Sequence, residues 1–233
     1  MKYTGKFWRS LDMARLIRVH PDARTLAHAG AARLLTRLID LQSEKTPVHI
    51  ALTGGTIGIA LLAALNQNPA KDAVDWTGVH IWWSDERFLP LGHPDRNDTQ
   101  ARNALLHSLT QAKVHPVPFA ETAELAATIY AADLPERMDV TLLGVGPDGH
   151  VASLFPSHPG LSATGRIIAV HNTPKPPSER VSFTMAELDN SNEVWLVVSG
   201  NNKATALRSP GLPAAQVHGR KLTLLLADVA AVS

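Results

Sequence analysis

Apolar residues along this chain follow two patterns that alternate from one end to the other. Residues 21–45 place small or apolar side chains at helical spacing, on one face of a single helix. These positions are Leu26, Gly30, Leu34, Leu38 and Leu41. The segment VHIAL at residues 48–52 is instead short and mostly apolar, which is typical of a strand buried on both faces of a sheet.

Later segments repeat the same two patterns. Strands are expected within residues 79–87, 139–146, 166–172, 180–185 and 193–200, and the apolar segment at residues 221–230 closes the chain. Helices are expected over residues 56–67, 99–109 and 121–134 and from residue 201 onward, with Thr99 as a cap of the second. This alternation favours a single α/β domain over residues 1–233, doubly wound, with a mostly parallel sheet and helices on both faces. Residues 175–188 are expected to add an antiparallel piece.

Composition narrows the classes of function. The 233 residues are 45% hydrophobic and 18% charged, with a net charge of +1, so bulk charge does not favour a nucleic-acid or anionic-membrane partner. The absence of cysteine excludes disulfides, cysteine-based zinc sites and a thiol nucleophile, and it fits a cytoplasmic protein. The first 20 residues have no apolar core of a signal peptide, and the longest apolar stretch, residues 57–65, is too short to span a bilayer.

Polar or glycine-rich segments follow four of the expected strands. They are TGGT at 53–56, SDER at 84–87, GVGPDGH at 144–150 and SGNNK at 199–203. Ligands of open parallel sheets bind outside the carboxyl ends of the strands. We therefore expect all four segments to lie at one edge of the sheet and to form one site.

The TGGT segment suits a phosphate group. A glycine turn that enters a helix leaves backbone N–H groups of Gly54, Gly55 and Thr56 unpaired, and the helix dipole adds positive charge. The hydroxyl groups of Thr53 and Thr56 add donors, although no G-K-[ST] follows as in a Walker A loop. The alternative is a tight turn that uses glycine for its backbone alone. Lys203 and Arg180 are further candidates, against the alternative of solvated surface cations.

The SDER segment ends a strongly apolar strand in three charged residues. Asp85, Glu86 and Arg87 are not expected to be buried together in the sheet. One interpretation is a strand that surfaces into a solvated turn. The other is an Asp85–Arg87 pair at the mouth of a buried layer, where it serves acid–base or oxyanion chemistry.

The GVGPDGH segment matches the G-x-G-x-x-G pattern of dinucleotide-binding folds, but its surroundings do not. No Asp or Glu occurs between Asp148 and Glu179 to bind a ribose, Pro156 interrupts the helix that should follow, and the segment lies in mid-chain. We instead expect the glycine loop to present His150 as a general base. The alternative is a histidine that caps the following turn. The sequence contains no H-E-x-x-H motif and no G-x-S-x-G motif.

These segments together resemble the 6-phosphogluconolactonase family. The resemblance rests on TGGT, WWSDERFLP with DRND, GVGPDGHVASLFP, RVSFT and SGNNKA, in the family's order over about residues 21–228. It implies a Rossmann-like fold and hydrolysis of 6-phospho-D-glucono-1,5-lactone to 6-phosphogluconate in the pentose phosphate pathway. No metal or organic cofactor is implied, and the expected partner is the small-molecule lactone. We expect a monomer or a weak homodimer.

The resemblance also implies roles for individual residues. His150 would be the general base, with Asp148 orienting it, and Asp85 and Arg87 would lie near the lactone. The phosphate ligands would be Thr53, Gly54, Gly55, Thr56, Arg180 and Lys203.

The sequence departs from the family pattern in two places. The turn reads TGGTIG, whereas the family usually starts it with serine and has a Thr-Pro pair after the glycines. The segment DRN replaces the family's D-S-N, and this leaves the role of Arg96 open.

Two other functions remain as alternatives. The wider superfamily includes glucosamine-6-phosphate deaminases, which carry a glutamate where this chain has Phe155, and this difference speaks against deamination. The second alternative is a non-catalytic sugar-phosphate sensor. Such a sensor is expected to carry a DNA-binding or partner segment, and the Asp148-Gly149-His150 loop favours catalysis instead.

Overall fold

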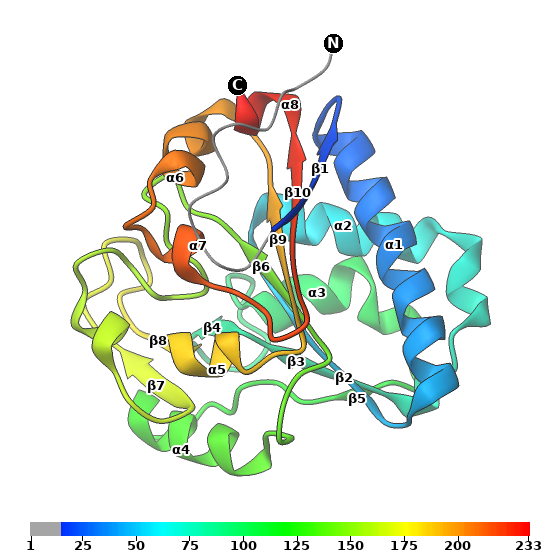
Figure 1. Cartoon of the computed structure of the whole chain (residues 1–233). Coiled ribbons are helices and arrows are strands. Elements are labelled where there is room, and N and C mark those ends of the chain that lie inside the picture. The colour runs from blue at the N-terminus through cyan, green and yellow to red at the C-terminus, as the bar shows by residue number, and fades with distance from the viewer. Residues whose placement is uncertain (1–14) are drawn as a thin grey trace.

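A seven-stranded parallel sheet forms the centre of the molecule in the computed structural model, which describes residues 15–233 (Figure 1). All neighbouring strands in it are parallel. In spatial order the strands are β1 (Leu16–His20), β10 (Leu222–Asp228), β9 (Glu193–Val198), β6 (Val140–Gly144), β2 (Val48–Leu52), β3 (Val79–Trp83) and β5 (Lys113–Val114). The predicted doubly wound α/β fold is confirmed.

The direction of winding reverses between β2 and β6. From β2 the chain continues to β3 and β5 on one side, whereas β6, β9 and β10 follow on the other. A crevice opens at such a reversal, outside the carboxyl ends of the two strands. The TGGT and GVGPDGH segments leave β2 and β6 at this point, so the topology brings them together.

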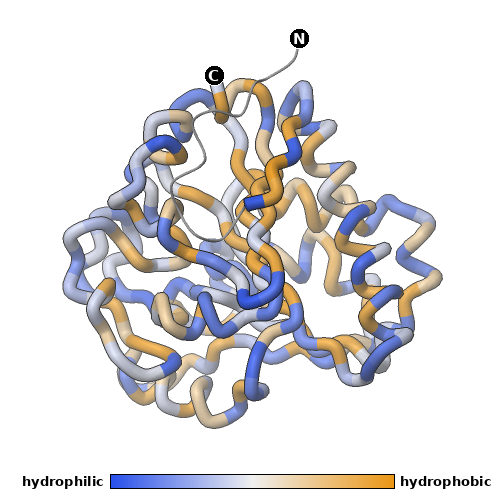
Figure 2. The backbone as a smooth tube through the Cα atoms, in the orientation of Figure 1, coloured by the Kyte–Doolittle hydropathy of each residue, from blue (hydrophilic) through white to orange (hydrophobic). Residues whose placement is uncertain are grey.

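Helices cover both faces of the sheet. The helices α1 (Ala23–Glu44), α2 (Gly55–Gln67) and α3 (Asn97–Ala104) pack on one face. The other face is covered by α4 (Ala123–Asp133), α5 (Met185–Asp189), α6 (Ala204–Arg208), α7 (Pro213–Gln216) and α8 (Val229–Val232). Trp83 belongs to the first core and Trp82 to the second, as alternation along a strand requires. Figure 2 shows the hydrophobic strands running through the middle of the molecule.

A second, antiparallel sheet stands beside the first. It consists of β4 (Asp85–Arg87), β8 (Arg180–Phe183) and β7 (Ile167–Val170), in that order. The expected antiparallel piece is therefore confirmed. As expected, the three charged residues after Ser84 are not all buried, because Arg87 is half-buried, but Asp85 and Glu86 are both buried. The interpretation of a solvated turn is wrong, because these residues form a strand.

A side chain caps the start of four of the eight α-helices among residues 15–233. Asp22 caps α1 by accepting a hydrogen bond from the N–H of Thr25 at 2.8 Å. The helix α3 starts at Asn97, so Thr99 lies inside it and is not its cap, contrary to the prediction. The carboxylate of Glu86 instead accepts the N–H groups of Asn97 and Asp98, at 2.6 and 2.9 Å.

Several short elements lie outside the predicted ones. The strands β1 and β5 lie at the two edges of the large sheet, and β1 carries the exposed Arg18 and Val19. The helices α7 and α8 each have one turn. Short 3₁₀ turns complete the chain as η1 (Pro69–Ala73), η2 (Trp76–Gly78), η3 (Leu106–Ser108), η4 (Pro159–Ser162) and η5 (Asn201–Lys203).

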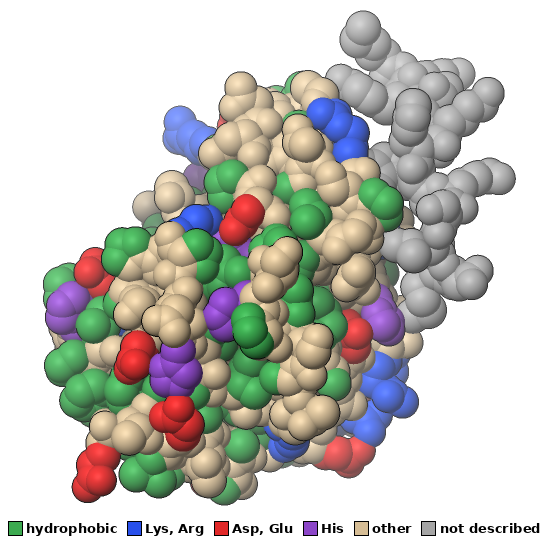
Figure 3. Space-filling view, turned by 90° about the vertical axis from the view of Figure 1, so that its left-hand side faces the viewer, with side chains coloured by type: hydrophobic (Ala, Val, Ile, Leu, Met, Phe, Trp, Pro, Cys, Tyr) green, Lys and Arg blue, Asp and Glu red, His purple; other side chains and the backbone are tan. Residues whose placement is uncertain are grey.

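One surface view shows how side chains are mixed on the outside. On the face turned to the viewer in Figure 3, acidic, basic and histidine side chains are interspersed with apolar ones. Within residues 15–233, no helix is both long enough and apolar enough to cross a membrane.

Three histidines line up across neighbouring strands of the large sheet. The rings of His49 and His80 lie 4.8 Å apart and those of His80 and His115 lie 4.9 Å apart, while Trp82 stacks on His115 at 3.8 Å. Burial, and then the charges of neighbouring groups, lower the pKa of all three, that of His49 to about 4. The folded protein therefore favours uncharged rings in this row.

The histidine row predicts a loss of stability in acid. Because its pKa in the folded chain lies below the unfolded value of about 6.5, His49 binds a proton more readily in the unfolded chain. The contribution of neutral His49 to the free energy of unfolding is complete above about pH 6.5 and falls as the pH approaches 4. We expect urea denaturation midpoints to decrease over this interval and to decrease less in a His49→Gln variant. The exposed His107→Gln is the control, and equal pH dependence in all three proteins would contradict the prediction.

Candidate active site

The four polar segments line one cavity of about 730 Å³ at the carboxyl ends of the sheet. Nine of the ten predicted site residues are on its wall, and the tenth, Asp148, contacts His150. The nine are Thr53, Gly54, Gly55, Thr56, Asp85, Arg87, His150, Arg180 and Lys203. The expectation that these loops meet at one edge of the sheet is confirmed.

Two adjacent glycines shape the turn into α2 for different reasons. Gly55 has φ +78°, a left-handed conformation that disfavours other residues, and open space around its Cα. Gly54 has an ordinary φ of −82°, but a Cβ there would lie 2.0 Å from Oδ1 of Asn97. The hydroxyl oxygen of Thr53 accepts a hydrogen bond from the N–H of Gly144 at 3.1 Å. This bond joins the glycine turn before α2 to the loop after β6.

His150 and Asp148 form a hydrogen-bonded pair on the glycine loop after β6. Nδ1 of His150 lies 2.5 Å from Oδ1 of Asp148. When Nδ1 carries the proton toward this carboxylate, Nε2 has the lone pair that a general base needs. A Cβ on Gly146 would lie 2.0 Å from Nδ1 of His150, and Gly149 has φ +81°. The glycines that imitate a dinucleotide motif thus provide space and backbone freedom for this pair.

The surroundings of the pair set its protonation. Burial lowers the pKa of His150, partly offset by the hydrogen bond and charge of Asp148. For Asp148, burial acts to raise the pKa, but the hydrogen bond and charge of His150 outweigh it, so the pKa is lowered. The folded protein therefore favours a neutral imidazole beside an ionised carboxylate. This combination suits proton abstraction from water near neutral pH.

Phe155 packs against the catalytic candidate. The rings of Phe155 and His150 have centroids 4.5 Å apart, and Phe155 is almost fully buried. The guanidinium carbon of Arg180 lies 6.0 Å from the Phe155 ring centroid. From the family resemblance, a glutamate is expected at position 155 in deaminases. In this protein Phe155 instead places an apolar ring against the imidazole.

The strand β4 also contributes to the wall of the cavity. The carboxylate of Asp85 accepts a hydrogen bond from the hydroxyl of Ser153 at 2.6 Å. Arg87 donates from Nη1 to the carbonyl of Asp95 at 2.5 Å, while its buried Nε has no partner among residues 15–233. Asp85 adds negative charge that acts on His150. The two predicted residues of SDER therefore face the same cavity as the imidazole.

The two predicted cations outside β4 lie in different surroundings. Arg180 is paired in register with Arg87 across β4 and β8, and burial lowers its pKa. Burial also lowers the pKa of Lys203, and the nearby Lys175 lowers it further. Arg180 thus lies at the Asp85–Arg87 end of the cavity, and Lys203 lies near Lys175 and Asp148.

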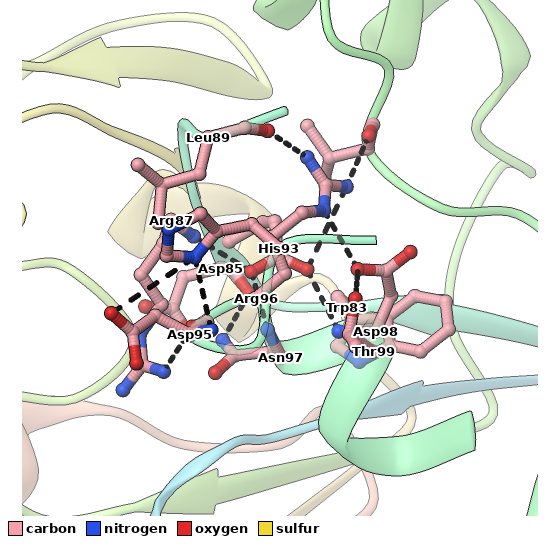
Figure 4. Close-up of polar contacts among 12 residues, drawn as sticks. Trp83, Asp85, Arg87, Leu89, His93, Asp95, Arg96, Asn97, Asp98 and Thr99 are labelled. Atoms are coloured by element: carbon pink, nitrogen blue, oxygen red, sulfur yellow. Dashed lines mark hydrogen bonds and ion pairs between the residues drawn. The ribbon is translucent and has the colours of Figure 1, made fainter. Parts of the chain in front are cut away.

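A buried ionic network fixes β4 to α3 (Figure 4). Arg96 is fully buried and donates to Asp98 at 2.7 Å and to the carbonyls of Leu89 and Val117 at 2.8 and 2.7 Å. Its Nη2 also lies 3.8 Å from the carboxylate of Glu86. Burial raises the pKa of Glu86 to about 8, although Arg96 acts to lower it. The role left open for Arg96 is thus structural.

Several residues that contact the site fall outside the sequence-based candidates, and three of them bind a candidate residue directly. Asn97 lines the cavity and donates from Nδ2 to the carbonyl of Asp85 at 2.9 Å. Ser153 holds Asp85, and Lys175 lies 3.7 Å from Asp148. Lys175 reaches the site from a separate loop, which spacing in the sequence does not reveal, whereas Ser153 lies in the quoted GVGPDGHVASLFP segment. Asn97 could have been found, since it directly follows Arg96 in the quoted DRND segment.

Comparison with known proteins gives the class of enzyme to which this fold belongs. The chain belongs to the family described as glucosamine-6-phosphate isomerases and 6-phosphogluconolactonases, whose model matches residues 21–225. A 6-phosphogluconolactonase of Streptomyces coelicolor is 46% identical, with 95% of each chain covered. A 6-phosphogluconolactonase of Mycobacterium tuberculosis is 36% identical over 93% of this chain and 96% of the relative.

Solved structures share the fold. The 6-phosphogluconolactonase of Thermotoga maritima superposes with a TM-score of 0.82 at 24% identity, over 92% of this chain and 100% of that one. A monomeric glucosamine-6-phosphate deaminase superposes with a TM-score of 0.78 at 17% identity, over 93% of this chain and 98% of that one. At these identities the likeness shows the common architecture, and the choice between the two reactions depends on the site.

Proposed function

We propose that this protein hydrolyses 6-phospho-D-glucono-1,5-lactone to 6-phosphogluconate, a step of the oxidative pentose phosphate pathway. The observation that carries the proposal is the His150–Asp148 pair facing the same cavity as the TGGT turn. The pair supplies a base for water, and the turn supplies donors for a phosphate group. The lactonase names of the two bacterial relatives point to the same reaction.

Phosphate binding is assigned to the turn before α2 and to the cations around it. The backbone N–H groups of Gly54, Gly55 and Thr56 lie at the start of this thirteen-residue helix, where its dipole favours an anion. Lys203 adds a positive charge on the cavity wall. Arg180 uses Nε and Nη2 to bind carbonyls of residues 175–177, so its contribution to the phosphate is mainly its charge.

The reaction follows from the position of His150. Nε2 of His150 takes a proton from water while the water oxygen forms a bond to the lactone carbonyl carbon. The resulting oxyanion is stabilised by Arg87. The bond between this carbon and the ring oxygen then breaks, and the ring oxygen takes the proton back from His150. The product acid ionises, so the net reaction consumes one water and releases one proton. Asp85, held by Ser153, is assigned to orienting the lactone end of the substrate.

The activity is tested with freshly prepared lactone and purified protein. Formation of 6-phosphogluconate is followed through NADPH production by added 6-phosphogluconate dehydrogenase, against the spontaneous hydrolysis of the lactone. We expect clear acceleration and no release of ammonia from glucosamine 6-phosphate. Ammonia release without lactone hydrolysis would instead establish the deaminase alternative, against which the Phe155 wall speaks. Absence of both activities with retained binding would favour a sensor.

Removal of the Lys203 charge is expected to weaken substrate binding. A Lys203→Ala variant should raise KM about tenfold and leave kcat nearly unchanged, because a phosphate contact far from the reacting carbon is the same in ground and transition states. Steady-state kinetics in the coupled assay measures both values. Lys221→Ala is the matched control. Lys221 is exposed and directly precedes β10, so it lies at the amino ends of the strands, whereas the cavity lies at their carboxyl ends. An unchanged KM would remove Lys203 from the phosphate site.

Location and assembly belong to the same proposal. We assign the protein to the cytoplasm, as the enzyme of a soluble metabolite, with a monomer or weak homodimer as its state. All residues of the proposed site come from a single chain, so a second copy is not needed to complete it. Light scattering on the purified protein measures the mass.

A further inference from the structure

Lys175 reaches the His150–Asp148 pair from a different part of the chain. It lies in the loop between β7 and β8, and its Nζ is 3.7 Å from Oδ1 of Asp148. This is the same carboxylate oxygen that lies 2.5 Å from Nδ1 of His150. The imidazole and the ammonium thus both contact the carboxylate of Asp148, which connects them.

The backbone that carries Lys175 is firmly held. Its carbonyl accepts hydrogen bonds from Oγ1 of Thr173 at 2.8 Å and from Nη2 of Arg180 at 3.2 Å. Arg180 and Thr173 also bind the carbonyl of Pro177, at 3.1 and 3.0 Å. The side chain of Lys175 is 44% exposed, but its starting point is fixed relative to β8 and to the cavity. The contact with Asp148 is therefore built into the loop, although the ammonium itself remains hydrated.

We propose that Lys175 is a positioning residue of the active site, which keeps Asp148 ionised and the imidazole of His150 neutral. A positive charge beside Asp148 favours the ionised form of its carboxyl group. The ionised carboxylate accepts the Nδ1 proton of His150 in a hydrogen bond and so keeps this proton directed away from the cavity. The same positive charge opposes protonation of the nearby imidazole. Lys175 thereby increases the fraction of His150 that can accept a proton from water at neutral pH. This consequence for catalysis rests on the proposed lactonase function.

Other charges face His150 and act in both directions. Asp148 and Asp85 raise the pKa of His150, whereas burial and Lys175 lower it. Arg24, Arg87, Arg180 and Lys203 line the same cavity, as does His28. Lys175 also lines the cavity, but it differs from these other cations because it lies within 4 Å of the carboxylate that is hydrogen-bonded to the imidazole. Its removal should therefore affect the titration of His150 directly.

The test is an NMR titration of the His150 ring in the full-length protein without ligand. The chain has 11 histidines, and a His150→Gln variant identifies the signal of His150 by its loss. We expect Lys175→Gln and Lys175→Met to raise the pKa of His150 by about 0.5, as expected for the loss of a partly hydrated charge at this range. Lys175→Arg keeps the charge and should titrate like the wild type. Lys221→Gln removes a lysine charge at the amino ends of the strands and should also leave the value unchanged.

The outcomes separate this inference from the proposed function. An unchanged His150 titration in both neutral Lys175 variants would overturn the inference, and a raised KM with that result would make Lys175 a substrate ligand instead. In the lactonase assay, the acidic limb of kcat/KM should move upward by the same amount in Lys175→Gln. Ionisation of the substrate phosphate is common to all variants, so differences between them belong to the protein. A wild type without lactonase activity would defeat the proposed function, and the NMR result would still decide the inference.

Discussion

Replacing His150 by alanine is expected to lower kcat for lactone hydrolysis by about 10²–10⁴-fold, with little change in KM. The imidazole is assigned to both proton transfers, from the attacking water and to the leaving ring oxygen. The proposed phosphate ligands lie elsewhere on the cavity wall, so substrate binding should persist. Coupled steady-state assays measure both constants after subtraction of the spontaneous reaction.

Two further variants make the His150 result specific. His107→Ala removes an exposed histidine far from the cavity and should retain full turnover. Asp148→Asn keeps the shape of the side chain but removes the negative charge that faces Nδ1 of His150. This substitution should therefore also lower kcat. Near wild-type turnover in His150→Ala would exclude the imidazole as the general base, whatever the other variants do.

An Arg96→Met substitution is expected to destabilise the folded chain by about 3–5 kcal/mol, the range for removing one partner of a buried ion pair. Arg96 is 0% exposed and is hydrogen-bonded to Asp98, Leu89 and Val117. Its loss leaves a buried carboxylate and two carbonyls without these donors. Urea denaturation followed by circular dichroism measures the change in the free energy of unfolding.

Arg102→Met is the matched comparison for Arg96→Met. Arg102 contacts the same Asp98 at 4.0 Å, but its side chain is 41% exposed. Solvent screens such a pair, so its removal should cost less than about 1 kcal/mol. Similar losses in both variants would show that burial of Arg96 does not determine the stability of this network. Because the network holds β4 against α3, Arg96→Met should also reduce turnover through Asp85 and Arg87.

Hydrophobic patterning was sufficient to predict the architecture and the edge at which the site lies. The central strands carry apolar side chains toward both faces, so their sequence alone distinguishes them from the helices between them. The edge strands β1 and β5 lack this signal, because β1 has a solvated side and β5 has only two residues. Short elements such as α7 are fixed by tertiary contacts and leave no periodic pattern.

The charged strand β4 shows where local reasoning failed. Three consecutive charges after Trp83 suggest solvent exposure, but Glu86 is buried because its carboxylate accepts backbone N–H groups of Asn97 and Asp98, eleven and twelve residues later. The partners of Asp148 and Asp85 are likewise set by folding, since Lys175 and Ser153 come from separate loops. Sequence patterns predicted candidate groups that line one cavity, whereas the contacts that support these groups required the structure.

The close approach of Asn97 to Gly54 has an evolutionary consequence. No side chain fits at position 54 while the amide of Asn97 occupies the space where a Cβ would lie. The two positions, one before the start of α2 and the other at the first residue of α3, are therefore expected to covary among homologues. A residue larger than glycine at 54 should be accompanied by a smaller residue at 97. Such paired changes would mark lineages in which the packing between the TGGT turn and α3 has changed.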